Sequence, residues 1–223
     1  MKPHAGEPLI TAGARLGTSP AVMIMVHGRN AAPENILDLV PHFERPDFTY
    51  LAPAAAGRTW YPHSFMADRQ KNEPGLSSGL WVLEHLVADV VAHGIQKEHV
   101  ILLGFSQGAC LMSEFAVRHA DRYGAVIAYS GGLIGEPGTT WDYPGNFRGT
   151  PVFLGCSDVD AHVPKGRVDE TAAVFTRMGA TVTERIYPGM AHTVNADEIA
   201  FTRSLMDSLA PIRVREGAPV PIA

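Results

Sequence analysis

Six short apolar runs, each bounded by glycine, proline or polar residues, constrain the fold of this chain more than any other feature. Runs of this length that are rich in valine and isoleucine are typical of parallel strands buried on both faces. They occupy residues 21–26, 48–53, 99–105, 124–130, 151–156 and 181–188. Helical patterns lie between them, so the sequence predicts a doubly wound, mostly parallel α/β sheet with helices on both faces.

The clearest helical pattern covers residues 76–94, where apolar residues recur at helical spacing and Gly94 follows as a stop signal. Further helices are predicted at about 107–119, 167–178 and 196–209. We expect one domain over residues 1–210 and a C-terminal tail, 211–223, that is either loose or docked on a neighbour. The segment 133–149 is dense in glycine and proline and is too short for a cap domain, so we expect an open site.

The overall charge excludes several kinds of partner. The formal net charge is -5 with 18% charged residues, so no basic surface is indicated for nucleic acid or an anionic membrane.

The N-terminus lacks the apolar stretch of a secretory signal, and the longest apolar run is far shorter than a membrane span. We therefore expect a cytoplasmic protein. Cys110 and Cys156 lie in apolar segments without metal-type spacing, which favours buried reduced thiols.

A serine lies between two glycines in the stretch GFSQG, residues 104–108, after a predicted strand and before a predicted helix. This is the setting of the G-x-S-x-G nucleophile elbow, in which a strained turn exposes the serine and neighbouring backbone leaves no room for Cβ atoms. The pattern makes Ser106 a candidate nucleophile. The alternative is a plain strand-to-helix turn in which the serine only caps the helix.

A serine nucleophile needs a base, and the base needs an acid that orients it. In elbow-type hydrolases these follow the serine in the order acid, then histidine. The strand at 151–156 is followed by Asp158 and Asp160, and the strand at 181–188 is followed by His192. All three lie at carboxyl ends of parallel strands, where ligand crevices form. Taken singly, the aspartates could be turn or helix-capping residues and His192 a solvated loop histidine.

Two backbone N–H groups are predicted to form an oxyanion hole, which stabilises negative charge on a reacting carbonyl oxygen. One belongs to Gln107, the residue after the candidate nucleophile. The other belongs to Arg29, after the His27-Gly28 pair that ends the first apolar run. Gly28 lets the backbone approach, and His27 is interpreted as a structural residue that holds the turn.

No cofactor or metal is predicted. The sequence contains neither G-x-x-x-x-G-K-[ST] nor G-x-G-x-x-G, the glycine-rich patterns that bind phosphates. It also lacks H-E-x-x-H and any Cys/His cluster with the spacing of metal ligands.

Five motifs together resemble the phospholipase/carboxylesterase family of α/β-hydrolases, which includes acyl-protein thioesterases and small bacterial carboxylesterases. They are HG at 27–28, GFSQGA at 104–109, YSGGL at 129–133, D-x-x-V-P at 160–164 and GMAH at 189–192. The resemblance spans nearly the whole chain. It implies that Ser106 is the nucleophile, His192 the base and Asp160, rather than Asp158, the acid.

The chain departs from the family pattern around the expected substrate pocket. Arg29 and Asn30 follow HG where the family usually has a small or apolar residue, and residues 57–65 replace the commoner tryptophan-containing loop. Apolar residues on loops at the same strand ends are candidates for the acyl pocket, with packing beneath each loop as the alternative. These candidates are Trp60, Phe65, Leu133 and Met190.

These observations predict a serine hydrolase that cleaves small-molecule carboxylic esters or thioesters through an acyl-enzyme intermediate. One alternative is a hydrolase of lactones or ring-cleavage products on the same fold. The other is a non-catalytic protein that binds a ligand in the same crevice. Small hydrolases of this kind are often dimers, so a homodimer is also an open expectation.

Overall fold

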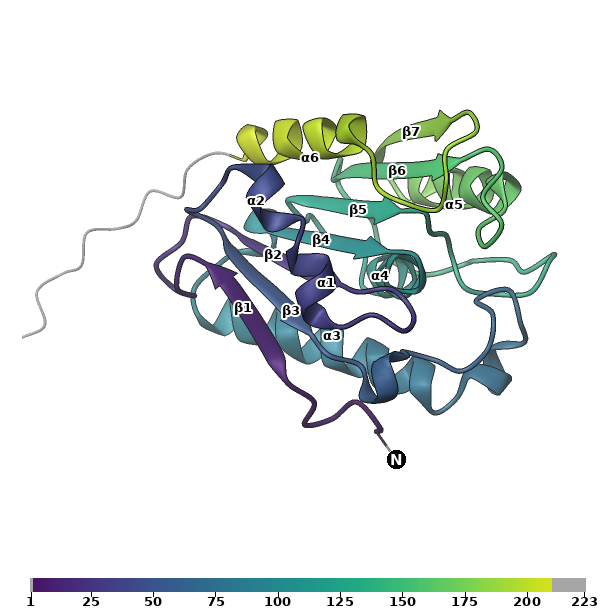
Figure 1. The fold of residues 1–223 in the computed structure, drawn as a ribbon, viewed down its shortest axis with the longest axis horizontal. Coiled ribbons are helices and arrows are strands. Elements are labelled where there is room, and N and C mark those ends of the chain that lie inside the picture. Colours follow the sequence, from purple (N-terminus) through teal and green to yellow (C-terminus); the bar gives the residue numbers. More distant parts are fainter. Residues whose placement is uncertain (1, 210–223) are drawn as a thin grey trace, which may run out of the picture.

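A seven-stranded sheet forms the centre of the computed structural model, which describes residues 2–209. The strands are β1 (Leu9–Gly13), β2 (Val22–Val26), β3 (Thr49–Pro53), β4 (Val100–Phe105), β5 (Ala125–Tyr129), β6 (Pro151–Ser157) and β7 (Thr181–Tyr187). Their order in the sheet is β1-β3-β2-β4-β5-β6-β7 (Figure 1). β1 pairs antiparallel with β3, and every other pair is parallel. The predicted mostly parallel α/β sheet is therefore confirmed.

All six predicted strands are present, but the sequence analysis missed β1. This strand lies at the edge of the sheet, and its residues alternate between exposed and half-buried. The central strands β2, β3 and β5 are buried along their whole length. A continuous apolar run marks a strand that is covered on both faces, and an exposed edge strand such as β1 does not need one.

Helices cover both faces of the sheet (Figure 1). They are α1 (Pro33–Leu37), α2 (Val40–Phe43), α3 (Gly75–Ala92), α4 (Gln107–Arg118), α5 (Lys165–Arg177) and α6 (Ala196–Ser208). Val22, Ile24 and Val26 of β2 pack with α3, α4 and α5, whereas Met23 and Met25 pack with α1, α2 and α6. Alternate side chains of one strand thus serve two separate cores. The four predicted helices are confirmed, with ends displaced by no more than two residues.

Helix α3 is long and apolar enough by composition to cross a membrane, and half of it is buried within the protein. Leu83 and Val90 are fully buried in the core formed with α4 and the sheet. This burial accounts for the apolar composition of α3 as that of a core helix. The predicted tail, residues 211–223, lies outside the described residues.

The parallel strands position the candidate site. β2, β4, β6 and β7 run in the same direction, so the segments that follow their last residues emerge at one edge of the sheet. These segments carry the HG pair, the elbow serine, the two aspartates and the histidine that the sequence singled out. The carboxyl ends of parallel strands are where open α/β sheets hold their ligands.

Candidate active site

Ser106 occupies the strained turn between β4 and α4. Its backbone angles are φ 55° and ψ -122°, a conformation that L residues rarely adopt. A Cβ atom on Gly104 would lie 2.5 Å from the carbonyl oxygen of Gly108, and one on Gly108 would lie 2.2 Å from that of Val26. Both glycines are therefore required by backbone contacts. The turn has the geometry of a nucleophile elbow and not that of an ordinary helix cap, since Ser106 makes no side-chain capping bond.

The side chains of Ser106, His192 and Asp160 form one hydrogen-bonded series. His192 Nδ1 lies 2.7 Å from Asp160 Oδ2, and His192 Nε2 lies 2.8 Å from Ser106 Oγ. Because a carboxylate can only accept, Nδ1 of a neutral His192 carries the proton and Nε2 accepts from the serine hydroxyl. The Asp160 side chain is fully buried, and that of His192 is 21% exposed. The structure thus brings together the three residues predicted to form the triad.

Asp160 is held in its ionised form by several donors. Burial opposes ionisation, but hydrogen bonds from His192 and from the backbone N–H groups of His162 and Val163 outweigh it and lower the pKa of the carboxyl. Asp158 points elsewhere and accepts a 2.7 Å hydrogen bond from the N–H of Gly189. Asp158 therefore stabilises the loop that carries His192. Within residues 2–209, the carboxylate that bonds the imidazole is that of Asp160.

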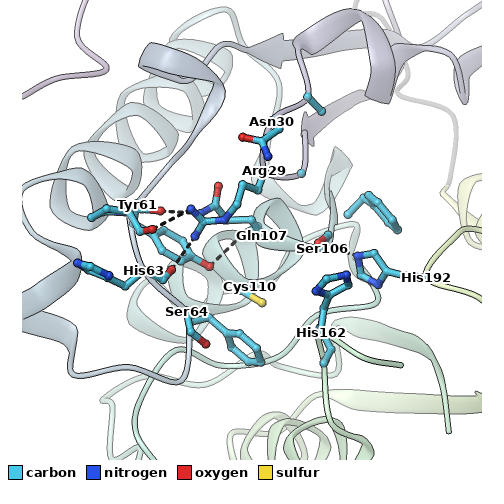
Figure 2. Close-up of a pocket in the computed structure, with 16 residues that line it drawn as sticks. Arg29, Asn30, Tyr61, His63, Ser64, Ser106, Gln107, Cys110, His162 and His192 are labelled. Atoms are coloured by element: carbon cyan, nitrogen blue, oxygen red, sulfur yellow. Dashed lines mark hydrogen bonds between the residues drawn. The ribbon is translucent and has the colours of Figure 1, made fainter. Parts of the chain in front are cut away.

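A cavity of about 510 Å³ opens beside Ser106. Arg29, Gln107 and His192 line it together with the serine, so the two predicted oxyanion donors lie on the same cavity as the candidate nucleophile (Figure 2). Gln107 is the first residue of α4, where backbone N–H groups have no acceptor within the helix. The arrangement can present amide hydrogens to a ligand bound at Ser106.

The side chains of the same two residues hold one segment of the cavity wall. Gln107 accepts from the N–H of Trp60 at 3.0 Å and donates to the carbonyl of Tyr61 at 2.8 Å. Arg29 donates to the carbonyls of Pro62 and His63 at 2.9 and 2.6 Å (Figure 2). Four consecutive residues, 60–63, are therefore tied to the two predicted oxyanion residues.

Of the four apolar pocket candidates, only Phe65 lines this cavity. Trp60 is fully buried, with its indole N–H bonded to the carbonyl of His27, and Leu133 is fully buried in the core. Met190 lies half-buried in the loop after β7, with its sulfur 3.0 Å from Asn195 Nδ2. Each of these three packs against its own loop or the core, so the structure places them apart from the cavity lining.

The sequence analysis missed His162 and Tyr61 as cavity residues. The ring of His162 meets that of His192 edge-on, with 4.8 Å between centroids, and its N–H bonds the buried carboxylate of Asp160. Its place within D-x-x-V-P was a signal that could have found it. Tyr61 is buried, and its hydroxyl donates to the carbonyl of Gln107 at 3.4 Å. No local sequence pattern predicts that Tyr61 lines the cavity.

His27 and the two cysteines have structural surroundings. His27 is buried, accepts from the N–H of Ala55 at 3.2 Å and lies 2.8 Å from the carbonyl of Gly28 through its other ring nitrogen. Burial lowers its pKa, which favours the neutral ring that these partners require.

Cys110 and Cys156 are free and buried, and burial raises the pKa of each thiol to about 12. Within residues 2–209, no three His, Cys, Asp or Glu side chains gather where they could hold a metal ion.

The sheet, the elbow turn and the positions of the site residues define an α/β-hydrolase. The sequence profile of the Phospholipase/Carboxylesterase family matches residues 16–209. The chain belongs to this family and is therefore a hydrolase of the esterase or thioesterase type.

Individual relatives agree with the family assignment. A phospholipase/carboxylesterase of known structure from Dyadobacter fermentans is 38% identical, with a TM-score of 0.87 over 90% of this chain and 96% of the other. Acyl-protein thioesterase 1 of Eremothecium gossypii is 27% identical over 72% of this chain and 69% of its own length. Acyl-protein thioesterase 1 of Saccharomyces cerevisiae is 31% identical over 56% of each chain.

Proposed function

We propose that this protein is a serine hydrolase that cleaves carboxylic esters or thioesters through an acyl-enzyme intermediate. The observation that carries the proposal is the hydrogen-bonded series Asp160–His192–Ser106, with distances of 2.7 and 2.8 Å, in which His192 and Ser106 line a cavity. A buried carboxylate, a partly exposed imidazole and a strained serine are the parts that activate a hydroxyl at neutral pH. Thioesters are included because two relatives are named acyl-protein thioesterases.

In the first half of the reaction, Ser106 Oγ attacks the carbonyl carbon of the substrate and its proton passes to His192 Nε2. Asp160 accepts from Nδ1–H and stabilises the imidazolium that forms. The N–H groups of Arg29 and Gln107 donate to the oxygen that becomes negative. His192 then returns the proton to the departing alcohol or thiol, and the acyl group stays on Ser106.

In the second half, water takes the place of the alcohol or thiol. His192 removes a proton from the water as the water oxygen attacks the acyl carbon, and the proton then returns to Ser106 Oγ as the carboxylic acid leaves. The cavity supplies Phe65, Phe105 and Val163 as apolar contacts for the acyl group. Neither half requires a cofactor.

A fluorophosphonate probe tests this function directly. We expect stoichiometric covalent modification of Ser106, located by mass spectrometry, and no modification of a folded Ser106→Ala variant. Folded wild-type protein that resists the probe would instead indicate a binding protein that uses the same cavity. A series of 4-nitrophenyl esters and thioesters of increasing chain length, together with a lactone, would then define the substrate.

We also propose a cytoplasmic location, which the two free, buried cysteines support because reducing compartments keep thiols unpaired. A homodimer stays a prediction, and light scattering coupled to size-exclusion chromatography tests it.

A further inference from the structure

Arg29 carries the one fixed charge in the cavity beside Ser106, among the lining residues that the structure describes. Those residues include no aspartate, glutamate or lysine. Their other polar side chains are neutral hydrogen-bonding groups or histidines, such as Asn30, His63 and His162. Among the described lining residues, Arg29 is thus the only cation with a fixed charge, although the net charge of the chain is -5. The ionised carboxylate of Asp160 contacts His192 and does not itself line the cavity.

The guanidinium of Arg29 is held in position, unlike that of an ordinary surface arginine. It donates to the carbonyls of Pro62 and His63 and lies 6.0 Å from the centre of the Tyr61 ring. Figure 2 shows the side chain extended along the wall of the cavity toward these residues. Because two carbonyls on one short segment hold the group, its charge has a defined place relative to Ser106.

The two carbonyls leave part of the guanidinium available to a ligand. A guanidinium has five N–H donors, and the bonds to Pro62 and His63 occupy two of them. Among the described residues, no further acceptor is bound to the Arg29 side chain. Arg29 is also exposed to solvent, so an incoming anion would not have to displace a carboxylate partner.

We propose that Arg29 forms an anion subsite in this cavity, so that the enzyme favours esters or thioesters that carry a carboxylate or phosphate on the acyl or leaving group. A planar guanidinium matches the geometry of such anions, and the charge strengthens each hydrogen bond. A neutral substrate of the same shape gains neither contribution. The inference rests on the proposed function, since it concerns which substrates reach Ser106.

The experiment compares matched pairs of substrates that differ only in charge. For an anion on the acyl side, the pair is mono-4-nitrophenyl adipate and its methyl ester. For an anion on the leaving group, the pair is 4-acetoxybenzoate and its methyl ester. We expect Arg29→Met to lower the ratio of kcat/KM for the anionic to the neutral member about tenfold in at least one pair. Intrinsic reactivities cancel when the ratio of the variant is divided by that of the wild type.

Arg58→Met is the matched control. Arg58 is exposed and lies outside the lining of this cavity. Its backbone carbonyl accepts from the N–H of Asn30 at 2.8 Å, and the substitution keeps that carbonyl while it removes the same net charge as Arg29→Met. We expect its ratio to stay within about twofold of the wild-type ratio. Added salt should lower the wild-type ratio and leave that of Arg29→Met nearly unchanged, because salt screens an exposed charge.

Two results would overturn the proposal. If Arg29 only braces residues 62–63, Arg29→Met lowers kcat/KM for both members of each pair equally and the ratio does not change. If the charge acts only through the overall field, Arg58→Met changes the ratio as much as Arg29→Met does. Hydrolysis of the two neutral esters by the wild type, and its loss in Ser106→Ala, tests the proposed function separately.

Discussion

His192 Nε2 lies 2.8 Å from Ser106 Oγ, although 86 positions separate the two residues in the chain. β5 and β6 lie between β4 and β7, the strands that the two residues follow. The loop after β7 must therefore reach back across the sheet, and the His192 ring rests 5.0 Å from that of Phe105, the residue before the serine. Interactions along this loop decide whether the imidazole reaches the hydroxyl.

Replacing Ser106 with alanine should remove the nucleophile and leave the fold intact. We expect turnover of a 4-nitrophenyl ester to fall on the order of 10⁶-fold, with residual hydrolysis from the remaining site. Steady-state kinetics measure the loss, and circular dichroism verifies the fold. A variant that keeps more than about a hundredth of wild-type turnover would rule out Ser106 as the nucleophile.

Asp160→Asn should be far more damaging than Asp158→Asn. The first change removes the carboxylate that lies 2.7 Å from His192 Nδ1, and we expect kcat to fall roughly 10⁴-fold. The second keeps an oxygen that can accept from the N–H of Gly189, so its effect should be much smaller. The kcat values of the two variants, measured side by side, decide the assignment of the acid, and the reverse order would transfer that role to Asp158.

Gly108→Ala and Gly28→Ala test how tightly the elbow is built. A Cβ on Gly108 would lie 2.2 Å from the carbonyl oxygen of Val26, whereas one on Gly28 would meet Phe105 and Ser106 at 3.4 Å. We expect Gly108→Ala to lower the free energy of unfolding by about 3 kcal/mol or more, and Gly28→Ala to change it by less than about 1 kcal/mol. Urea unfolding measures both, and equal effects would contradict the close approach of Gly108 to the Val26 carbonyl.

Glu198 should make stability depend on pH. Its side chain is fully buried and accepts from the N–H of Asn195 at 2.8 Å, while Oε1 finds no partner within the described part of the chain. Burial raises its pKa from 4.5 to about 7. The folded state therefore favours the protonated form of Glu198. The stabilisation that Glu198 contributes to the folded state is complete below about pH 4.5 and is lost as the pH rises toward 7.

We expect the free energy of unfolding to fall by at most about 3 kcal/mol as Glu198 ionises. This fall should be absent in Glu198→Gln, because glutamine cannot ionise. The measurement is the difference in Tm between the wild type and the variant at pH 5 and at pH 8. The Tm of the wild type, measured relative to that of Glu198→Gln, should be lower at pH 8 than at pH 5. A difference that is the same at both pH values would show that Glu198 does not titrate in this range.

Much of the fold could be predicted because the central strands are covered on both faces. The apolar runs marked the buried strands β2 to β6, and helical spacing marked α3 to α6. The run at 181–188 also marked β7, although this strand lies at the edge of the sheet and has no buried residue. The edge strand β1 and the short helices α1 and α2 were missed. A half-exposed strand and helices of five and four residues carry too few apolar positions to form a pattern.

The sequence by itself determined the turn at Ser106, because glycines two residues on either side meet backbone that any Cβ would strike. It also determined that aspartate and histidine follow parallel strands and emerge at one edge of the sheet. The family resemblance at D-x-x-V-P pointed to Asp160 rather than Asp158, and the structure places Asp160 against His192. Only the tertiary structure decided that Phe65 rather than Trp60 lines the cavity, and that residues 62–63 hold Arg29. These outcomes depend on the direction of side chains in loops, which is set by contacts with segments distant in the chain and not by local periodicity.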